Sequence, residues 1–258
     1  MNIAGIEIGD VNPCRFVAEL SNAHNGDFDR ALSLIDAAKA AGADFVKLQC
    51  YTPDELVALR GDGPAPEPWG AHGWTMRTLY EKARTPHEWF PYLFKYAGLQ
   101  HIPIFSSVFG SESLALLESC GCPAYKIARL DNDQRDFIGT VVDTGKPVIV
   151  SGADNDPWVV GADLTLYCPP GYPQSSFGFE RAVAECGSDG SFGCRDGFSF
   201  HGTDAFPCVV AATLGAKLIE AHLMLRDQPS ELEANVSLDE YQFAAMVRDV
   251  RRMEAMVA

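Results

Sequence analysis

The sequence predicts an α/β fold, a (β/α)8 TIM barrel that forms a single domain over residues 1–258. A short β-rich apolar run, a loop and a helix with 3.6-residue periodicity recur along the chain, which is typical of parallel strands joined by helices. Small-residue stops such as AAGADF and DTGKPV end the helices before a new strand. Polar residues follow the apolar runs, and in a barrel such positions meet at one end, where active sites lie.

Eight apolar runs are predicted as the barrel strands. Residues 16–20 form the first, and the turn HNGD leads from it into a helix over ALSLIDAAKAAGA. Residues 45–49 form the second, and a long loop and a pair of helices then carry the chain to Leu99. The remaining predicted strands are 104–107, 124–128, 148–151, 163–168, 197–200 and 217–222.

Three segments depart from the regular unit. The first fifteen residues are predicted as a β-hairpin that turns at residues 10–13 and could plug the other end of the barrel. After the fifth strand only about a dozen residues, ADNDPWVVGADL, precede the next strand, which makes this unit too short for a full crossover helix. The loop at residues 69–74, rich in Pro and Gly, could be a lid or a solvated excursion.

Composition excludes several classes of protein. Hydrophobic residues make up 47% of the chain and charged residues 21%, which is enough to bury a core. The formal charge of −15 argues against a nucleic-acid partner, although a few local cations could still bind a small anionic substrate. No apolar run approaches the roughly 20 residues that span a bilayer, and no secretion signal is visible. We therefore expect a cytoplasmic protein without a membrane partner.

The cysteines show no pattern of a metal or disulfide site. None of them form C-x2-C pairs, and several lie within apolar runs, where Cys behaves as a small buried hydrophobe. We expect reduced thiols at positions 14, 50, 120, 122, 168, 186, 194 and 208.

His201 and His222 are the strongest candidates for chemistry. Each follows or ends an apolar run, GFSF and KLIEA, one unit apart, so adjacent strands would bring both imidazoles to the same rim. Neutral imidazole is a common ligand of Zn, Mn and Fe, and a two-histidine site leaves positions open for water and substrate. The alternative is that both are ordinary hydrogen-bonded histidines.

Lys47, Lys126 and Glu19 are charged residues at the ends of predicted strands. A lysine inside an apolar run such as FVKLQ or AYKIA is costly unless an anion is nearby. Each lysine could neutralise a phosphate or carboxylate or form a Schiff base, or it could form a structural ion pair with Glu19 or Asp131. Glu19 could act as an acid or base, bind a sugar hydroxyl, or serve as the buried partner of Lys47.

Taken together, the chain resembles the N-acetylneuraminate (sialic acid) synthase family. The resemblance lies in the order of motifs over nearly the whole chain: AELSNAHNG, DAAKAAGADFVKLQCY, LYEKARTPHEWF, IFSSVF, PAYKIA, TGKPVIVSG, GFSFHGTD, TLGAKLIEAH and SLDEYQF. It implies an enzyme that condenses phosphoenolpyruvate with an open-chain aldose or another aldehyde to give a nonulosonic acid and phosphate.

The resemblance also implies roles for individual residues. His201 and His222 match the ligands of a divalent metal, Mn²⁺ first and Mg²⁺, Co²⁺ or Zn²⁺ as alternatives, which would polarise the aldehyde. Glu19 matches a catalytic residue near the acceptor sugar. The residues that match substrate-binding positions are Lys47, Gln49, Ser107, Phe109, Lys126, Ser151, Tyr172, Ser199 and, in a weaker local match, Glu233.

Several positions depart from the family's pattern. The family carries a C-terminal antifreeze-like domain that delivers an arginine into the site of a partner subunit, and we expect this chain to lack it. Phe200 stands where the family has an acid before the first histidine, Pro170 replaces an asparagine, and Arg129 replaces a serine. Arg129 could supply the missing guanidinium, or it could pair with Asp131 or Asp133.

These departures leave other functions open. A related barrel enzyme could use a different acceptor or donor, and a catalytically silent barrel could serve as a binding or scaffold subunit. The expected partners are phosphoenolpyruvate and a sugar or other aldehyde, and a homodimer is one assembly that the sequence allows.

Overall fold

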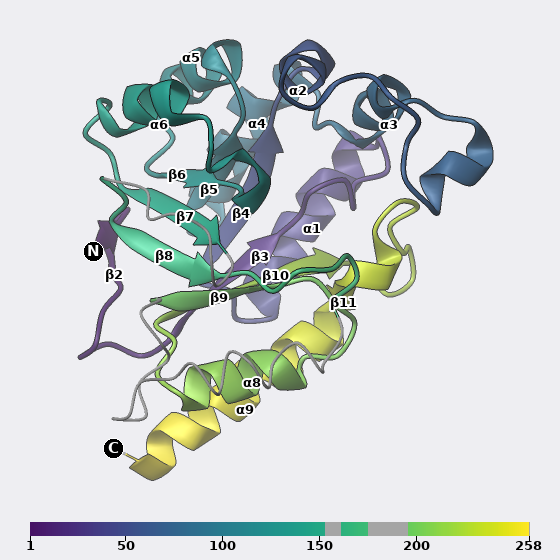
Figure 1. Cartoon of the computed structure of the whole chain (residues 1–258). Helices are drawn as coiled ribbons and strands as arrows, with labels where there is room; N and C mark the ends of the chain where they lie inside the picture. Colours follow the sequence, from purple (N-terminus) through teal and green to yellow (C-terminus); the bar gives the residue numbers. More distant parts are fainter. Residues whose placement is uncertain (153–160, 175–195, 258) are drawn as a thin grey trace.

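The computed structural model describes residues 1–152, 161–174 and 196–257, and within them eight parallel strands form a closed barrel (Figure 1). Neighbouring strands pair in the order of the chain, and the last of them, β10, pairs with both β9 and β3. Because the last strand joins the first, the barrel is closed and the predicted fold class is confirmed. The barrel strands are β3 (Arg15–Glu19), β4 (Phe45–Cys50), β5 (Ile104–Val108), β6 (Tyr125–Ile127), β7 (Val148–Gly152), β8 (Leu164–Tyr167), β9 (Gly197–Phe200) and β10 (Leu218–Met224).

Helices follow the strands and cover the outside of the barrel. The first of them begins at the N-cap Asp27, whose side chain accepts a hydrogen bond from the Arg30 amide, and it ends before Gly42, where φ is 87°. The described α-helices are α1 (Phe28–Ala40), α2 (Pro53–Arg60), α3 (Met76–Ala83), α4 (Phe90–Leu99), α5 (Ser111–Ser119), α6 (Arg135–Val142), α8 (Phe206–Thr213) and α9 (Glu240–Val257). The short 3₁₀ helices are η1 (Trp69–His72), η2 (His87–Trp89), η3 (Arg129–Asp131) and η5 (Ala234–Val236).

Two parts of the barrel differ from the regular unit. A short strand, β11 (Ser237–Asp239), lies parallel to β10 and is not among the strands predicted from the sequence. The shortened unit that we predicted after the fifth strand involves residues 153–160, which lie outside the described residues. Among the residues that the structure describes, no helix has both the length and the apolar character needed to cross a bilayer.

The N-terminal hairpin exists, but its turn was predicted at the wrong place. Strands β1 (Asn2–Ile3) and β2 (Ile6–Glu7) pair antiparallel around Ala4 and Gly5, which have φ angles of 49° and 88°. Asn2 Oδ1 accepts a hydrogen bond from the Gly5 amide and stabilises this turn. Residues 10–13, where we had placed the turn, belong to a separate bend that leads into β3.

The hairpin closes the amino-terminal end of the barrel. Ile3 and Ile8 are almost fully buried and belong to the same core cluster as the strands. A second, smaller apolar cluster lies at the opposite end, where α2 and α3 pack together beyond the ends of β4 and β5. It consists of Tyr51, Leu56, Tyr80 and Phe109. The carboxyl-terminal end of the barrel is therefore walled by apolar side chains on the side of α2 and α3.

Replacing Ile8 with Ala tests the role of the hairpin. Ile8 is 2% exposed, so the substitution should lower the free energy of unfolding by about 2–5 kcal/mol, as is usual for a cavity in a core. Val11, which is 96% exposed, offers a control in the same segment, and Val11→Ala should change it by less than about 0.5 kcal/mol. Urea unfolding of both variants measures the difference, and equal effects would contradict the assignment of the hairpin to the core.

Candidate active site

Strand register brings polar side chains together at the carboxyl-terminal end of the barrel. His222 of β10 pairs with Glu19 of β3, and Glu19 in turn pairs with Lys47 of β4. Ser107 of β5 pairs in the same way with Lys126 of β6. Paired residues on neighbouring strands point to the same side of a sheet, so these side chains all enter the barrel interior.

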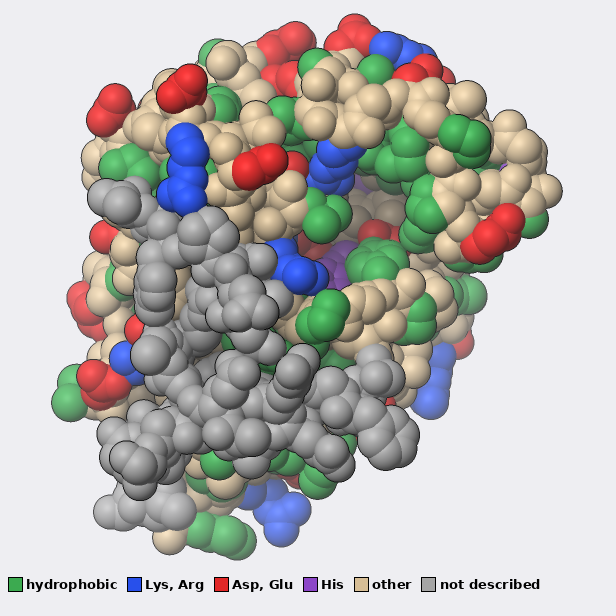
Figure 2. All heavy atoms as spheres, viewed as in Figure 1, with side chains coloured by type: hydrophobic (Ala, Val, Ile, Leu, Met, Phe, Trp, Pro, Cys, Tyr) green, Lys and Arg blue, Asp and Glu red, His purple; other side chains and the backbone are tan. Residues whose placement is uncertain are grey.

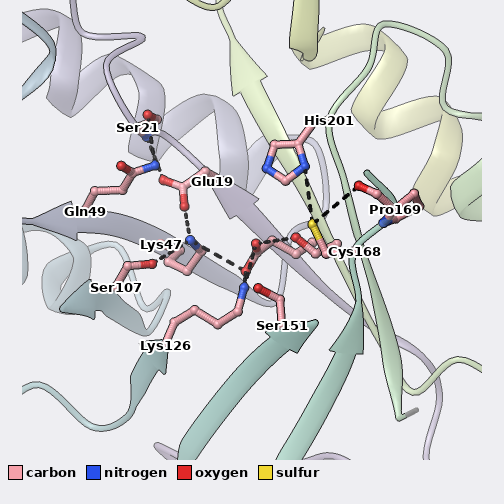
Figure 3. A network of polar contacts seen from close by, with 12 residues as sticks. Glu19, Ser21, Lys47, Gln49, Ser107, Lys126, Ser151, Cys168, Pro169 and His201 are labelled. Carbon is pink, nitrogen blue, oxygen red and sulfur yellow. Dashed lines mark hydrogen bonds and ion pairs between the residues drawn. The ribbon is translucent and has the colours of Figure 1, made fainter. Parts of the chain in front are cut away.

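Three of these interior side chains, together with Glu220 of β10, form a buried cluster of charges. Lys126 Nζ lies 3.0 and 3.1 Å from the two carboxylate oxygens of Glu220, and Lys47 Nζ lies 3.6 Å from Glu220 Oε2. Lys47 also forms an ion pair with Glu19. Figure 3 shows Glu19, Lys47 and Lys126 converging from three different strands. All four residues are less than 5% exposed, so the two lysines and two carboxylates balance one another away from water.

At Glu220 and Lys47 the ion pairs outweigh the cost of burial, whereas at Lys126 burial outweighs the pairing with Glu220 and lowers the pKa of the ammonium group. Burial alone would raise the pKa of the Glu220 carboxyl, but the charges of Lys126 and Lys47 hold that pKa below its usual range. Burial would likewise lower the pKa of Lys47, yet Glu19 and Glu220 raise it. Both groups are therefore charged at neutral pH, and the cluster presents fixed charges to the space above it.

Hydroxyl and amide side chains surround this cluster. Lys47 donates a hydrogen bond of 3.0 Å to Ser107 Oγ, and Ser199 Oγ donates one of 2.8 Å to Glu220. Gln49 Nε2 donates to Ser21 Oγ at 3.1 Å. Ser151 is buried beside them and lines the same cavity. Donors and acceptors thus face the cavity from several strands.

His201 and His222 lie side by side above the charges. Their ring centroids are 4.9 Å apart, with an angle of 54° between the planes. Burial, with the neighbouring His222, lowers the pKa of His201 to about 3, so this imidazole is neutral. Burial would also lower the pKa of His222, but the carboxylate of Glu233, 3.4 Å from its Nδ1, raises it. Tyr172 hydrogen-bonds to the same carboxylate, and its ring lies 5.2 Å from that of His201.

The spacing of the two rings fits a shared metal ion. Two imidazoles that bind one metal through bonds of about 2.1 Å, at an angle of roughly 90–110°, have centroids about 5 Å apart. The His222 ring fits further because Glu233 contacts its Nδ1, as carboxylates do behind metal-binding histidines. Among the described residues, no group of three or more His, Cys, Asp or Glu side chains is arranged for a metal. The two histidines would therefore leave most coordination positions to water or substrate.

The segment that carries Glu233 is tied to the loop after β3. Asn25 donates a hydrogen bond to the Pro229 carbonyl oxygen and accepts one from the Glu231 amide. Ser230 donates to Asn22 Oδ1 at 2.7 Å. Asn25, which the HNGD pattern explained only as part of a turn, thus also helps to place the carboxylate behind His222.

Gln174 and Cys168 surround the Nδ1 side of His201. Gln174 Oε1 accepts a hydrogen bond from the His201 amide, and its Nε2 lies 2.7 Å from the Pro169 carbonyl oxygen and 3.1 Å from His201 Nδ1. Cys168 Sγ lies 4.0 Å from the same nitrogen, a contact drawn in Figure 3. Burial raises the pKa of the Cys168 thiol, so it stays protonated.

The charge cluster, the two histidines, Gln174 and Cys168 all line one cavity of about 510 Å³. Figure 2 shows this hollow, with His and acidic side chains visible inside it and apolar side chains at its rim. The outer wall includes Leu56, Trp69 and Met76, and the Trp69 ring lies 6.3 Å from that of Tyr172. The loop proposed as a lid therefore does reach the mouth of the cavity, at Trp69.

Every predicted site residue lines this cavity. They are Glu19, Lys47, Gln49, Ser107, Phe109, Lys126, Arg129, Ser151, Tyr172, Ser199, His201, His222 and Glu233. Lys47 has the partner proposed for it, Glu19, but the structural partners proposed for Lys126 were wrong, because Lys126 pairs with Glu220. Asp131 accepts hydrogen bonds at both of its oxygens from Arg60, which was not among the predicted site residues.

Glu220 and Gln174, which contact the lysines and His201, were also missed. Glu220 lies two positions before His222, so the period of two in a strand could have placed both in the barrel interior. Gln174 follows the PGYP segment, where no periodic pattern indicates which way a side chain points. Phe200, which replaces an acid in the family's pattern, is buried with its ring 5.7 Å from that of Phe198. Six described cysteines are free, as expected, and Cys186 and Cys194 lie outside the described residues.

Comparison with known proteins gives consistent matches. The sequence profile of the NeuB family matches residues 34–156 and 166–258. A pseudaminic acid synthase of Helicobacter pylori is 35% identical over 94% of this chain and 75% of its own length. One of Campylobacter jejuni (strain 81-176) is 33% identical over 97% of this chain and 77% of its own length. The crystal structure of an N-acetylneuraminic acid (sialic acid) synthetase from Leptospira borgpetersenii superposes with a TM-score of 0.82 at 21% identity, covering 100% of this chain and 90% of that one, which shows a shared fold.

Replacing Glu220 with Gln tests the charge cluster. The substitution leaves Lys126 buried without its counter-ion, which should lower the free energy of unfolding by about 3–5 kcal/mol. Asp10→Asn is the control, because Asp10 also pairs with a lysine, Lys217, but is 84% exposed, and it should change that free energy by at most about 1 kcal/mol. Urea unfolding at neutral pH compares the two. A loss below 1 kcal/mol for Glu220→Gln would mean that the lysines do not depend on it.

Proposed function

The chain belongs to the NeuB family, and from that premise we propose that it joins phosphoenolpyruvate to the aldehyde carbon of an open-chain sugar. The observation that carries the proposal is that two buried lysines and two neighbouring histidines line one cavity. The lysine ammonium groups can bind anionic phosphoenolpyruvate, and the imidazole groups can bind the carbonyl oxygen of the sugar, directly or through a metal. C3 of phosphoenolpyruvate would bond to the aldehyde carbon, one water would add at C2, and the C2–O bond to phosphate would break, so that a nonulosonic acid is released with inorganic phosphate.

Lys126 is the better placed of the two lysines to bind the anion. Lys47 already faces three partners, Glu19, Ser107 and Glu220, and an ammonium group has only three hydrogens to donate. Among the residues that the structure describes, Lys126 hydrogen-bonds to the single carboxylate of Glu220, so it keeps donor capacity for a phosphate or carboxylate oxygen. Ser107, Ser151 and Ser199 line the same part of the cavity and would add neutral donors.

The acceptor sugar would lie nearer the mouth of the cavity. Tyr172 and Glu233 form a hydrogen-bonded pair beside His222 that can orient a sugar hydroxyl, and Glu19 can accept a proton or a hydroxyl hydrogen deeper in the barrel. Leu56, Met76 and Trp69 offer an apolar wall that suits acyl or deoxy groups on the sugar. We propose Arg129, which also lines this cavity, as a further cation for the bound anion.

A divalent metal is part of this proposal. Nε2 atoms of His201 and His222 would hold it, with Mn²⁺ as the first choice and Mg²⁺, Co²⁺ or Zn²⁺ as alternatives. When bound, it would supply Lewis acidity to the aldehyde oxygen. Glu233 would keep His222 oriented. The buried carboxylates and lysines would hold phosphoenolpyruvate in line with the sugar aldehyde. A homodimer, a cytoplasmic location and a single domain stay predictions from the sequence.

A phosphate-release assay tests the function directly. The protein with phosphoenolpyruvate, Mn²⁺ and a panel of N-acylated aldoses should release phosphate only when an accepted sugar is present, with one new acid formed per phosphate. Mass spectrometry identifies that acid. Phosphate release with a non-sugar aldehyde alone would point to a different acceptor. If no combination of substrates and metal gives turnover, the result would favour a catalytically silent barrel that serves as a binding or scaffold subunit.

Replacing Lys126 with Met tests the anion site. Loss of a charged hydrogen bond should weaken phosphoenolpyruvate binding by about 1.5–3 kcal/mol, measured by calorimetric titration. Lys146→Met is the control, because Lys146 forms a surface pair with Glu118 and does not line the cavity. Unchanged affinity in Lys126→Met, with the fold intact, would place the anion elsewhere.

A further inference from the structure

The amide of Gln174 can have only one orientation. The His201 backbone N–H can only donate, and it lies 2.9 Å from one end of the amide, which must therefore be Oε1. The Pro169 carbonyl can only accept, and it lies 2.7 Å from the other end, which must be Nε2. Gln174 is 7% exposed, so bulk water does not compete for these bonds. Two backbone groups thus fix which end of the side chain carries hydrogen.

This orientation determines which nitrogen of His201 carries its proton. Gln174 Nε2 has two hydrogens and three acceptors within reach: the Pro169 carbonyl at 2.7 Å, His201 Nδ1 at 3.1 Å and Cys168 Sγ at 3.6 Å. One hydrogen goes to Pro169, and the other goes to His201 Nδ1, because this nitrogen is nearer than the sulfur, which is only a weak acceptor. His201 Nδ1 must therefore accept, and a neutral imidazole that accepts at Nδ1 carries its hydrogen on Nε2. The other neighbour of Nδ1, the Cys168 thiol at 4.0 Å, is at most a weak acceptor and so does not favour a proton on Nδ1.

The other histidine has the opposite surroundings. His222 Nδ1 faces the carboxylate of Glu233, an acceptor, so its proton belongs on Nδ1 and its Nε2 lone pair is available. If a metal bound Nε2 of both rings, His222 would already offer a lone pair at this nitrogen, whereas His201 would carry a hydrogen there. At His201 the Nε2 proton would have to leave, and Nδ1 would have to take up a proton against the Gln174 donor.

We propose that Gln174 is a positioning residue that holds His201 in the Nε2–H tautomer and thereby weakens metal binding at this site. The inference rests on the metal site of the proposed function and adds a determinant of its affinity. Metal binding then requires the Gln174 side chain to turn away from Nδ1. Until it does, His201 presents an N–H donor to the cavity in place of a lone pair.

The tautomer can be measured without any metal. Long-range proton–nitrogen correlation spectra of the metal-free protein, labelled with ¹⁵N-histidine, distinguish Nδ1–H from Nε2–H, and the signal missing in His201→Asn identifies this ring. We expect a protonated Nε2 for His201 and a protonated Nδ1 for His222. A protonated Nδ1 at His201 would overturn the proposal.

Titration with Mn²⁺ alone tests the consequence. Gln174→Ser admits water, which can accept from Nδ1, and Gln174→Met removes the donor while keeping most of the volume. Both should bind Mn²⁺ about 10-fold more tightly than the wild type, the lower end of the usual effect behind a metal ligand. Gln49→Ser is the matched control, since Gln49 lines the same cavity but hydrogen-bonds to Ser21 and to neither histidine. Its affinity for Mn²⁺ should stay unchanged.

The outcomes separate this inference from the proposed function. Equal or weaker affinity in both folded Gln174 variants, with Mn²⁺ bound by the wild type, would overturn the role of Gln174 and leave the metal site standing. No Mn²⁺ bound by the wild type or by either variant would overturn the metal site itself, and with it this account of its affinity. The His201→Ala, His222→Ala double variant should bind none and shows that the titration reports this site.

Discussion

The active-site end of the barrel depends on the carboxylate of Glu220, which two buried lysines share. Lys126 contacts both of its oxygens and Lys47 one of them, while Glu19 balances the second positive charge. Each ion alone would cost several kcal/mol to bury, and they are tolerated because each is paired and hydrogen-bonded. The cluster is thus close to neutral, and an arriving anion must compete with carboxylates that are already bound. Such competition favours a ligand that offers several oxygens at once over a simple monoanion.

The two histidines above the cluster are chemically unequal although they look like a matched pair. His222 is backed by a carboxylate, and His201 is backed by a carboxamide and a thiol. One ring is therefore set up to offer a lone pair, and the other to offer a hydrogen. A site of this kind can bind a carbonyl oxygen through His201 even before a cation arrives, as neutral imidazole does in other active sites.

Much of the fold could be predicted because the apolar pattern of the strands and the residues that end the helices indicate the same element boundaries. Apolar runs mark the strands, and glycines such as Gly42 and Gly145 adopt the positive φ that ends a helix. The site residues at strand ends followed from the same reasoning, since parallel strands bring those ends together. The hairpin was misplaced because residues 10–13 carry stronger turn signals than Ala4, whose positive φ is supported by the Asn2 side chain.

There are also physical reasons why Glu220 and Gln174 were not predicted. Glu220 lies within a hydrophobic strand, and although its spacing from His222 could have placed it in the interior, its pairing with two lysines became visible only when β10 was placed in the closed barrel. The partner of Lys126 could not be predicted because Glu220 lies 94 residues away in sequence, on a strand that is not its neighbour in the sheet. Gln174 acts through backbone groups of a loop, and no periodicity describes such contacts.

The hydrogen bonds between the loop after β3 and residues 229–231 have a consequence for the folding of the protein during its synthesis. Asn22 and Ser230 are 208 residues apart, and Asn25 reaches Pro229 across 204. Contacts so distant in sequence form late and slow the folding of a chain, because a large loop must close before they can stabilise anything. Glu233 therefore reaches His222 only after nearly the whole barrel has left the ribosome. Until then the lysines and carboxylates of the early strands lack Glu220, and the half-made barrel is the form most exposed to aggregation and to proteases.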